Sequence, residues 1–266
     1  MNPALTDMET SAPAPNVTMP LRRVLRAYAI EAKYESLRML RAPGFAGPFL
    51  LLPVGLYLLF AVLLFGAQMT KDPTGAMFTF MGFSVLGVMG PGMFGFGISV
   101  SMEREHGLLK LKRALPMPSA ASLVAKMLMS MLFVVIVMGT MVAAAPLGHL
   151  KLSATQLLSI SLVNTAGALP FCALGFLVGS LASAKAAPAF VNLLYLPMIY
   201  LSAILFPLPK PMHWVALLSP AYHLDQLGLA SMGFSSEGAP LVHVLVLAGL
   251  TLGFVTLALR RLRHVS

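Results

Sequence analysis

Acidic side chains are scarce in this sequence, and they are absent from six long stretches that also lack lysine and arginine. Only nine of the 266 residues are Asp or Glu, against 18 that are Lys or Arg. A helix needs about 20 apolar residues to cross the hydrocarbon core of a bilayer. The charge-free stretches therefore predict six transmembrane helices, over residues 47–67, 77–101, 127–148, 156–181, 189–206 and 241–259. Continuous apolar runs exclude the alternating pattern of a membrane β-barrel.

Composition supports one membrane domain and leaves no room for a second folded one. Charged residues make up 10% of the chain, whereas soluble domains carry about 25%. We expect an all-α membrane domain over residues 20–266. Residues 1–19 are polar and rich in Pro and Ala, without the apolar core of a signal peptide, so they are expected to form a disordered cytoplasmic tail.

Missing motifs exclude several kinds of chemistry. The single cysteine, Cys172, excludes a disulfide within the chain. No GxxxxGK[ST] loop is present, so the chain is not expected to hydrolyse ATP, and HExxH and GxSxG motifs are also lacking. The spans offer only His243, Asn164 and Asn192 besides hydroxyl groups, which disfavours a proton-driven pump. We therefore predict no catalytic residue and no enzyme activity, and uphill movement would need energy from a partner.

The basic residues give the predicted orientation. With both termini in the cytoplasm, 15 of the 18 basic residues lie inside, and only Lys71, Lys151 and Lys210 lie outside. Short loops follow the positive-inside rule, so this orientation is expected. The net charge of +9 then reflects topology and attraction to anionic membrane lipids. Nucleic acid is not an expected partner.

An amphipathic helix is predicted before the first span, over residues 20–42. Apolar residues recur at helical spacing on one face, and the basic residues Arg22, Arg23, Arg26 and Lys33 gather on another. Such a helix lies in the membrane interface and anchors the first span. Its basic face is also suited to docking a cytoplasmic partner, and the sequence leaves both roles open.

The second span is rich in glycine and carries a proline. Pro91 lacks a backbone N–H, so a kink is expected at Gly90, Pro91 and Gly92. Small residues also let helices approach closely, as in the two GxxxG pairs at Gly175 and Gly179 and at Gly249 and Gly253. GxxxG alone is weak support for any one contact.

The segment between the second and third spans, residues 102–126, is the most charged part of the chain. Leu108, Leu111 and Leu115 share a helical face, and Pro116 ends this short helix. Such a loop can serve topology alone. However, Glu103 and Glu105 are not needed for topology, which indicates a more organised element.

The segment before the last span, residues 207–240, is too short and interrupted to cross the membrane. We expect short re-entrant helices, with Trp214 and Tyr222 at the membrane interface. His213, His223 and Asp225 could approach one another here, but interfacial placement is the favoured interpretation. No metal site is predicted, and soft packing explains the 19 methionines as well as metal binding does.

Together these features resemble the ABC-2 type permeases. The resemblance rests on Glu103-Arg104-Glu105-His106-Gly107, on Leu111 to Pro116 with Lys126, and on Leu218 to Asp225 before the last span. It extends from about Arg22 to Arg263.

The resemblance implies the membrane subunit of an ATP-binding-cassette exporter. Two permease copies would pair with two separate ATPase subunits, which bind ATP and Mg²⁺, in the bacterial cytoplasmic membrane. A coupling segment would contact the ATPase, formed by Glu103, Arg104, Glu105, Gly107, Leu108, Leu111, Lys112, Leu115 and Pro116. The path would lie along spans two and five, with flex points at Gly90-Pro91-Gly92 and Pro197. The outer segment, with Trp214, Pro220, Tyr222, His223 and Asp225, would close its outer end.

The substrate and the alternatives stay open at this point. A path without charges favours an amphiphilic or apolar substrate, such as a drug, a lipid or a lipid-linked saccharide, moved outward. The alternatives are a non-transporting membrane scaffold or assembly factor and a metal or ion transporter. The lack of intramembrane carboxylates counts against the last of these.

Overall fold

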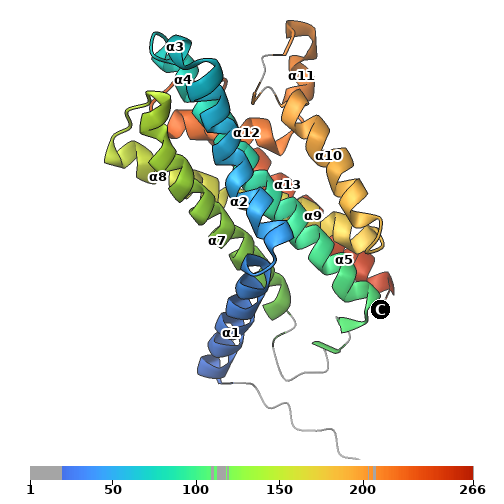
Figure 1. Cartoon of the computed structure of the whole chain (residues 1–266). Coiled ribbons are helices and arrows are strands. Elements are labelled where there is room, and N and C mark those ends of the chain that lie inside the picture. Colours follow the sequence, from blue (N-terminus) through green and yellow to red (C-terminus); the bar gives the residue numbers. More distant parts are fainter. Residues whose placement is uncertain are drawn as a thin grey trace, which may run out of the picture.

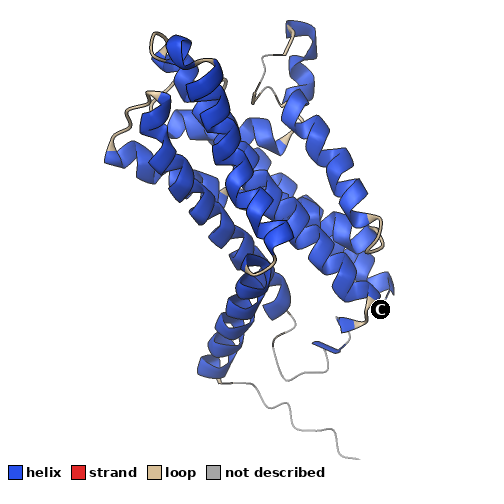
Figure 2. Cartoon of the chain, in the orientation of Figure 1, coloured by secondary structure: helices blue, strands red, loops and turns tan. Residues whose placement is uncertain are grey.

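The computed structural model describes residues 20–108, 111–112, 118, 120–202, 204–205 and 208–265. Every regular element in these residues is a helix (Figure 2). The predicted tail over residues 1–19, and Leu115 and Pro116 of the predicted coupling segment, lie outside the described residues.

The first half of the chain forms three long helical rods after an N-terminal helix. The N-terminal helix is α1 (Leu21–Leu40). The first rod is α2 (Pro43–Leu58) with η2 (Leu59–Leu64), followed by α3 (Gly66–Met69). The second is α4 (Pro73–Gly90), η3 (Pro91–Phe96) and α5 (Gly97–Glu105). The third is α7 (Ala121–Ala144) with η4 (Ala145–Gly148).

The second half forms three further helical rods, with short helices before the last. They are α8 (Ala154–Ala166) with α9 (Ala168–Leu181), then α10 (Ala187–Leu201), and finally α13 (Pro240–Val265). Between α10 and α13 lie η5 (Lys210–Met212), α11 (His213–Ala216) and α12 (Pro220–Ser231).

Five of these rods are long and apolar enough to cross a membrane, which confirms a multi-pass helical protein. They cover Pro43–Leu64, Pro73–Glu105, Ala121–Gly148, Ala154–Leu181 and Pro240–Leu262. The sixth predicted span, 189–206, corresponds to α10, which is apolar but has only 15 residues. A count of six spans therefore stays a prediction.

Two helices extend several residues beyond the predicted spans. Glu103, Arg104 and Glu105 form the last turn of α5, not the start of a loop. The third rod begins at Ala121, so Lys126 lies inside it and not before it. Both helices continue past charged residues because those side chains find partners within the protein, as described below.

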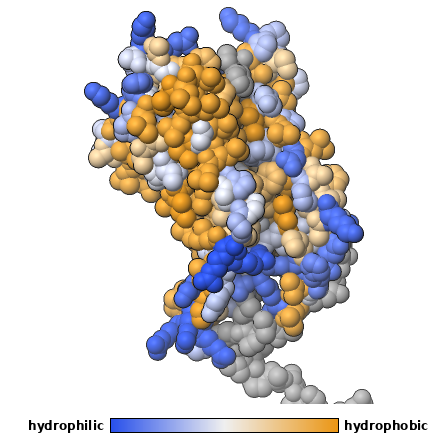
Figure 3. All heavy atoms as spheres, in the orientation of Figure 1, coloured by the Kyte–Doolittle hydropathy of each residue, from blue (hydrophilic) through white to orange (hydrophobic). Residues whose placement is uncertain are grey.

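The rods run side by side, and the two ends of the bundle differ (Figure 1). The N-terminal helix α1 and the C-terminal end of α13 lie at one end, whereas α3 and α11 lie at the other (Figure 1). Along the bundle, α13 packs on α9, and α1 packs on α7. Apolar side chains cover the middle of the visible face, and polar ones gather towards its two ends (Figure 3).

The predicted helix α1 is present, but the residues that it buries are polar, not those of its apolar face. Its buried residues are Glu35 and Ser36. Leu21 and Leu25 are 72% and 60% exposed. The four predicted basic residues, Arg22, Arg23, Arg26 and Lys33, are all exposed. The N-terminal half of α1 thus keeps an unpaired apolar side, while its C-terminal half is held by polar contacts.

Glycine permits a close contact between the second and fourth rods. A methyl group added at Gly175 would lie 2.6 Å from the Gly92 carbonyl oxygen, and one at Gly179 would lie 2.5 Å from that of Gly97. The backbones of α9 and of η3–α5 therefore touch without side chains between them. By contrast, nothing lies within 4 Å of such a group at Gly249 or Gly253.

The structure has a π-helical segment, η3, where the sequence predicted a kink. Pro91 is its first residue and cannot donate a backbone hydrogen bond, so the regular α-helical ladder is interrupted there. Pro197 lies inside α10. The roles of Gly90-Pro91-Gly92 and Pro197 as flex points stay predictions.

Candidate functional site

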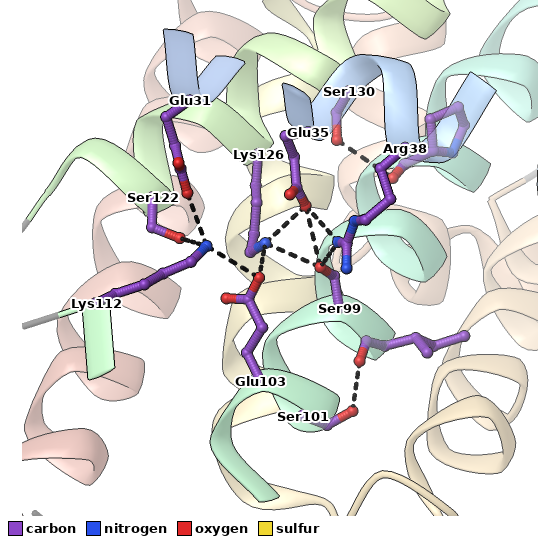
Figure 4. A network of polar contacts seen from close by, with 12 residues as sticks. Glu31, Glu35, Arg38, Ser99, Ser101, Glu103, Lys112, Ser122, Lys126 and Ser130 are labelled. Atoms are coloured by element: carbon purple, nitrogen blue, oxygen red, sulfur yellow. Dashed lines mark hydrogen bonds and ion pairs between the residues drawn. The ribbon is translucent and has the colours of Figure 1, made fainter. Parts of the chain in front are cut away.

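Charged side chains from α1, α5 and α7 meet at the end of the bundle that carries α1 (Figure 4). This ionic cluster consists of Glu31, Glu35, Arg38, Ser99, Glu103, Lys112, Ser122 and Lys126. It holds three carboxylates and three cationic groups, so its formal charges balance.

Lys126 is the centre of the ionic cluster. Its side chain is fully buried, and its Nζ lies 2.6 Å from Glu35 Oε1, 2.8 Å from Glu103 Oε1 and 2.9 Å from Ser99 Oγ. An ammonium group has three N–H donors, and each has an acceptor here. Burial of a lysine is tolerated because its charge is paired and its hydrogen bonds are satisfied.

A second lysine extends the cluster towards the segment after α5. The Nζ of Lys112 lies 2.7 Å from Glu31 Oε1 and 2.9 Å from Ser122 Oγ. It also lies 3.2 Å from Glu103 Oε1, so Glu103 bridges both lysines. Glu103 Oε2 is buried without a hydrogen-bond partner among the described residues.

The cluster shifts the ionisation of its members. Burial raises the pKa of Glu35, but the Lys126 ammonium and the Arg38 guanidinium lower it further, so it lies below its ordinary value of 4.5. Burial lowers the pKa of Lys112, while Glu31 and Glu103 raise it to above its ordinary value. The contribution of Glu35 to stability is therefore present above about pH 4.5 and is lost as the pH falls through the lowered pKa.

The neighbours of Glu103 in the predicted coupling segment hold another part of the fold. Arg104 donates hydrogen bonds to the carbonyl oxygens of Ser180 and Ala182, the latter at 2.6 Å. Glu105 accepts one from the Ala184 N–H at 2.6 Å. The end of α5 is thus tied to the connection between α9 and α10.

The remaining described residues of the predicted coupling segment lie nearer the surface. Gly107 has a positive φ of 71°, which ends the helix. Leu108 is 41% exposed and Leu111 is 59% exposed. Glu103 is only 3% exposed. Its carboxylate is therefore buried, whereas the resemblance implied that it would contact the ATPase at the surface.

Sequence reasoning missed Glu31 and Glu35 as site residues and placed Lys126 in a loop. One signal was available: Lys126 is followed and preceded by apolar residues at helical spacing, and a charge in such a position needs a buried partner. The identity of that partner depends on the packing of α1 against α7.

At the opposite end of the bundle lies a cavity of about 790 Å³. It is bordered by η2, α3, α4, the end of α10, α11 and α12. Among its described lining residues are six with phenyl or phenol rings, Phe60, Phe65, Phe78, Phe83, Tyr200 and Tyr222. Its polar lining consists of Gln68, Thr79, His213, Asp225, Gln226 and Glu237.

Asp225 is a buried carboxyl group in the cavity wall. It is 6% exposed, and its Oδ2 accepts one long hydrogen bond, 3.3 Å, from the Gln226 side chain. None of the ion pairs among the described residues includes it. Burial raises the pKa of Asp225 to about 8, although the Gln226 hydrogen bond lowers it.

Tyr222 and Glu237 form the other polar pair of the wall. The Tyr222 hydroxyl donates to Glu237 Oε2 at 2.8 Å. Burial and this carboxylate raise the pKa of Tyr222, so it stays a neutral donor. The His213 Nδ1 lies 4.0 Å from Glu237 Oε2. His213 and Asp225 thus both line the cavity, whereas His223 is not among its lining residues. The sequence had left such an approach open but favoured interfacial placement.

His223 and His243 form a pair behind Tyr222. Their Nδ1 atoms are 2.8 Å apart, while the Nε2 atoms face carbonyl oxygens, of Leu217 at 2.9 Å and of Glu237 at 2.7 Å. A carbonyl oxygen only accepts, so each Nε2 atom is the donor in its contact. Burial lowers the pKa of His223, and the neighbouring imidazole of His243 lowers it further.

The other residues of the predicted outer segment divide between surface and core. Trp214 is 63% exposed, as an interfacial residue would be. Tyr222, predicted at the same interface, is 5% exposed and belongs to the cavity wall instead. Pro220 is buried at the start of α12, which packs on α13, α8 and α4.

Comparisons with known proteins found a family model and a similar permease. Residues 27–232 match the family model of the ABC-2 type transporter, which is more than half of the chain. A similar protein is "Putative transport permease YvfS" of Bacillus subtilis (strain 168). It is 26% identical over 193 residues, which cover 71% of this chain and 78% of that protein.

Proposed function

Because the chain belongs to the ABC-2 type transporter family, as its motifs predicted, we propose that it is the membrane subunit of an ATP-binding-cassette exporter. The match over residues 27–232 carries this proposal. The five long apolar helices of the chain agree with a multi-pass membrane protein of this family.

The ionic cluster supports a role as the ATPase-facing end. It lies where α1 meets the end of α5, beside the predicted coupling segment. Leu108 and Leu111 expose apolar surface next to this rigid charged network. Exposed leucines on a braced element are suited to docking a partner protein.

The arrangement of the ends supports the predicted orientation. Since α1 and the C-terminal end of α13 lie at the same end of the bundle (Figure 1), an even number of crossings is the consistent topology, and the positive-inside rule places that end in the cytoplasm. The cavity then lies at the outer end, where residues 207–240 close it. The substrate is amphiphilic or apolar and leaves the cell.

The complex proposed here contains two copies of this chain and a separate ATPase. ATP and Mg²⁺ are bound by the ATPase subunit, and this chain carries no catalytic residue. The location is the bacterial cytoplasmic membrane, where membrane lipids surround the apolar rods.

The test is purification of the tagged chain together with its natural companions. We expect a stoichiometric ATPase to purify with it. Leu111→Asp places a charge in the proposed contact and should lower the amount of bound ATPase about tenfold, equivalent to about 1.4 kcal/mol. Leu218→Asp is the matched control, because Leu218 is 69% exposed but follows directly after α11, which lies at the opposite end of the bundle (Figure 1).

Two outcomes contradict the proposal. If no ATPase purifies under conditions that preserve other such complexes, a membrane scaffold or assembly factor becomes the better description. If Leu218→Asp releases the ATPase and Leu111→Asp does not, the ATPase binds at the other end and the orientation is reversed.

A further inference from the structure

We propose that the cavity beside Asp225 binds an amphiphilic organic cation, an inference that rests on the proposed function and narrows its substrate class. The cavity is closed on one side by α12, and its volume of about 790 Å³ suits a drug-sized molecule. Three features argue for a positive charge on that molecule.

The first feature is the unpaired carboxyl group. Asp225 is 6% exposed, yet among the described residues its hydrogen-bond partner is the Gln226 amide alone, at 3.3 Å. At the other end of the bundle, each buried carboxylate has a lysine within 2.8 Å. A buried carboxyl without such a partner is costly, and a bound cation would supply the missing charge.

The second feature is the balance of charge around the cavity. Asp225 and Glu237 both line it, and no lysine or arginine does. Two acidic side chains therefore face no lysine or arginine across the described part of the wall, and a ligand that carries a positive charge would pair with them.

The third feature is the aromatic lining. Six rings face the cavity, and the face of an aromatic ring attracts cations that carry apolar substituents. Leucine, isoleucine, methionine and alanine side chains form the rest of the described wall. Such a surface favours a bulky apolar body, while Asp225 favours a positive centre within it.

The test uses two ions of the same shape and opposite charge. The purified protein, with its companion ATPase where present, is placed in nanodiscs of zwitterionic lipid. Binding of radiolabelled tetraphenylphosphonium and tetraphenylborate is measured, and binding to empty nanodiscs is subtracted. We expect saturable binding of the cation and at least tenfold weaker binding of the anion.

Variants connect this binding to Asp225. Asp225→Asn removes the charge at constant size and should weaken tetraphenylphosphonium binding about tenfold or more. Asp225→Glu keeps the charge and should retain most of it. Asp72→Asn is the matched control: Asp72 caps α4 at the same end, its Oδ1 accepting from the Gly75 N–H at 2.9 Å, but it does not line the cavity. Asparagine is an equally good cap.

Each result decides the proposal. Equal binding of both ions, preference for tetraphenylborate, or unchanged binding in Asp225→Asn would overturn it. If Asp72→Asn also loses binding, changes anywhere at this end of the bundle disturb the cavity, and the result would contradict a specific role of Asp225 in binding the cation. Binding is measured without ATP hydrolysis, so its failure is distinguishable from a failure to find an ATPase.

Discussion

At the scale of single residues, Lys126 has the largest predicted effect on stability. Lys126→Met removes the ammonium between Glu35 and Glu103 and leaves two buried carboxylates without it. Breaking a buried ion pair from one side costs about 3–5 kcal/mol. We therefore expect a clear drop in melting temperature for the purified protein in detergent.

A compensating variant separates charge from packing. Combining Lys126→Met with Glu35→Gln and Glu103→Gln removes the charges together, so most of the lost stability should return. Lys33→Met, at an exposed position on α1, should change stability by less than about 0.5 kcal/mol. If the triple variant is no more stable than Lys126→Met, the ionic cluster matters through shape and not through charge.

The buried imidazole of His223 predicts a pH dependence of stability. In an unfolded chain a histidine titrates near 6.5. Burial, together with the neighbouring imidazole of His243, lowers the pKa of His223 in the folded chain. Below about pH 6.5 the unfolded chain therefore binds a proton at His223 that the folded chain does not, so the stability that His223 contributes is present above this pH and is lost as the pH falls.

The measurement compares the free energy of unfolding of wild type with that of His223→Asn between about pH 5 and 8. The stability of wild type relative to the variant should be constant above about pH 6.5 and fall below it, with a slope approaching about 1.4 kcal/mol per pH unit. A relative stability that rises as the pH falls would contradict the lowered pKa of His223.

At the scale of elements, the two GxxxG pairs have opposite predicted sensitivities. Gly175→Ala places a methyl group against the carbonyl oxygens of Gly92 and Met93, at 2.6 and 2.8 Å, so α9 must shift from η3. Overpacking of this kind costs about 1–3 kcal/mol. Gly253→Ala meets nothing within 4 Å and should be neutral or slightly stabilising through helix propensity.

Thermal unfolding of the two variants, measured side by side, checks this contrast. Equal destabilisation by both would mean that α13 also has a close neighbour, such as a second copy of the chain. No effect of Gly175→Ala would contradict the close approach of α9 to the second rod.

The helices themselves were largely predictable from apolar runs, because a bilayer requires long uncharged segments. The ends of the apolar runs do not mark the ends of the helices. Glu103 and Lys126 lie outside the runs, in the segment interpreted as a loop, but both are within helices. A sequence shows which positions carry charge but not which distant positions neutralise it. Glu35 and Lys126 are 91 residues apart and meet only through helix packing.

The same reasoning explains the partial success at the cavity. The outer segment was predicted from its length and its interruptions, and Asp225 was among its candidate residues. Tyr222 was assigned to the membrane interface because tyrosine is common there. Its burial follows from the packing of α12 on three other helices, which no local pattern encodes.

At the scale of the whole molecule, one continuous rod contacts both sites. The rod Pro73–Glu105 has 33 residues and is about 50 Å long at 1.5 Å per residue. Phe78, Thr79 and Phe83 near its start line the cavity, and Ser99 and Glu103 near its end belong to the ionic cluster. The other described elements that line the cavity contribute no residue to the ionic cluster. Between the two sites lies the π-helical segment η3.

This arrangement predicts that ligand binding and ATP hydrolysis are separable by mutation. In the complex with the ATPase, tetraphenylphosphonium should stimulate hydrolysis. Asp225→Asn should raise the concentration for half-maximal stimulation about tenfold and leave the maximum unchanged, because it weakens binding alone. Glu103→Gln should lower the maximum and leave that concentration unchanged, because the cavity stays intact while the cluster that braces α5 against α1 and α7 is weakened. Hydrolysis rates measured over a range of ligand concentrations distinguish the two effects. If Glu103→Gln changes the concentration for half-maximal stimulation and not the maximum rate, the ionic cluster affects ligand binding and not the step that links binding to hydrolysis.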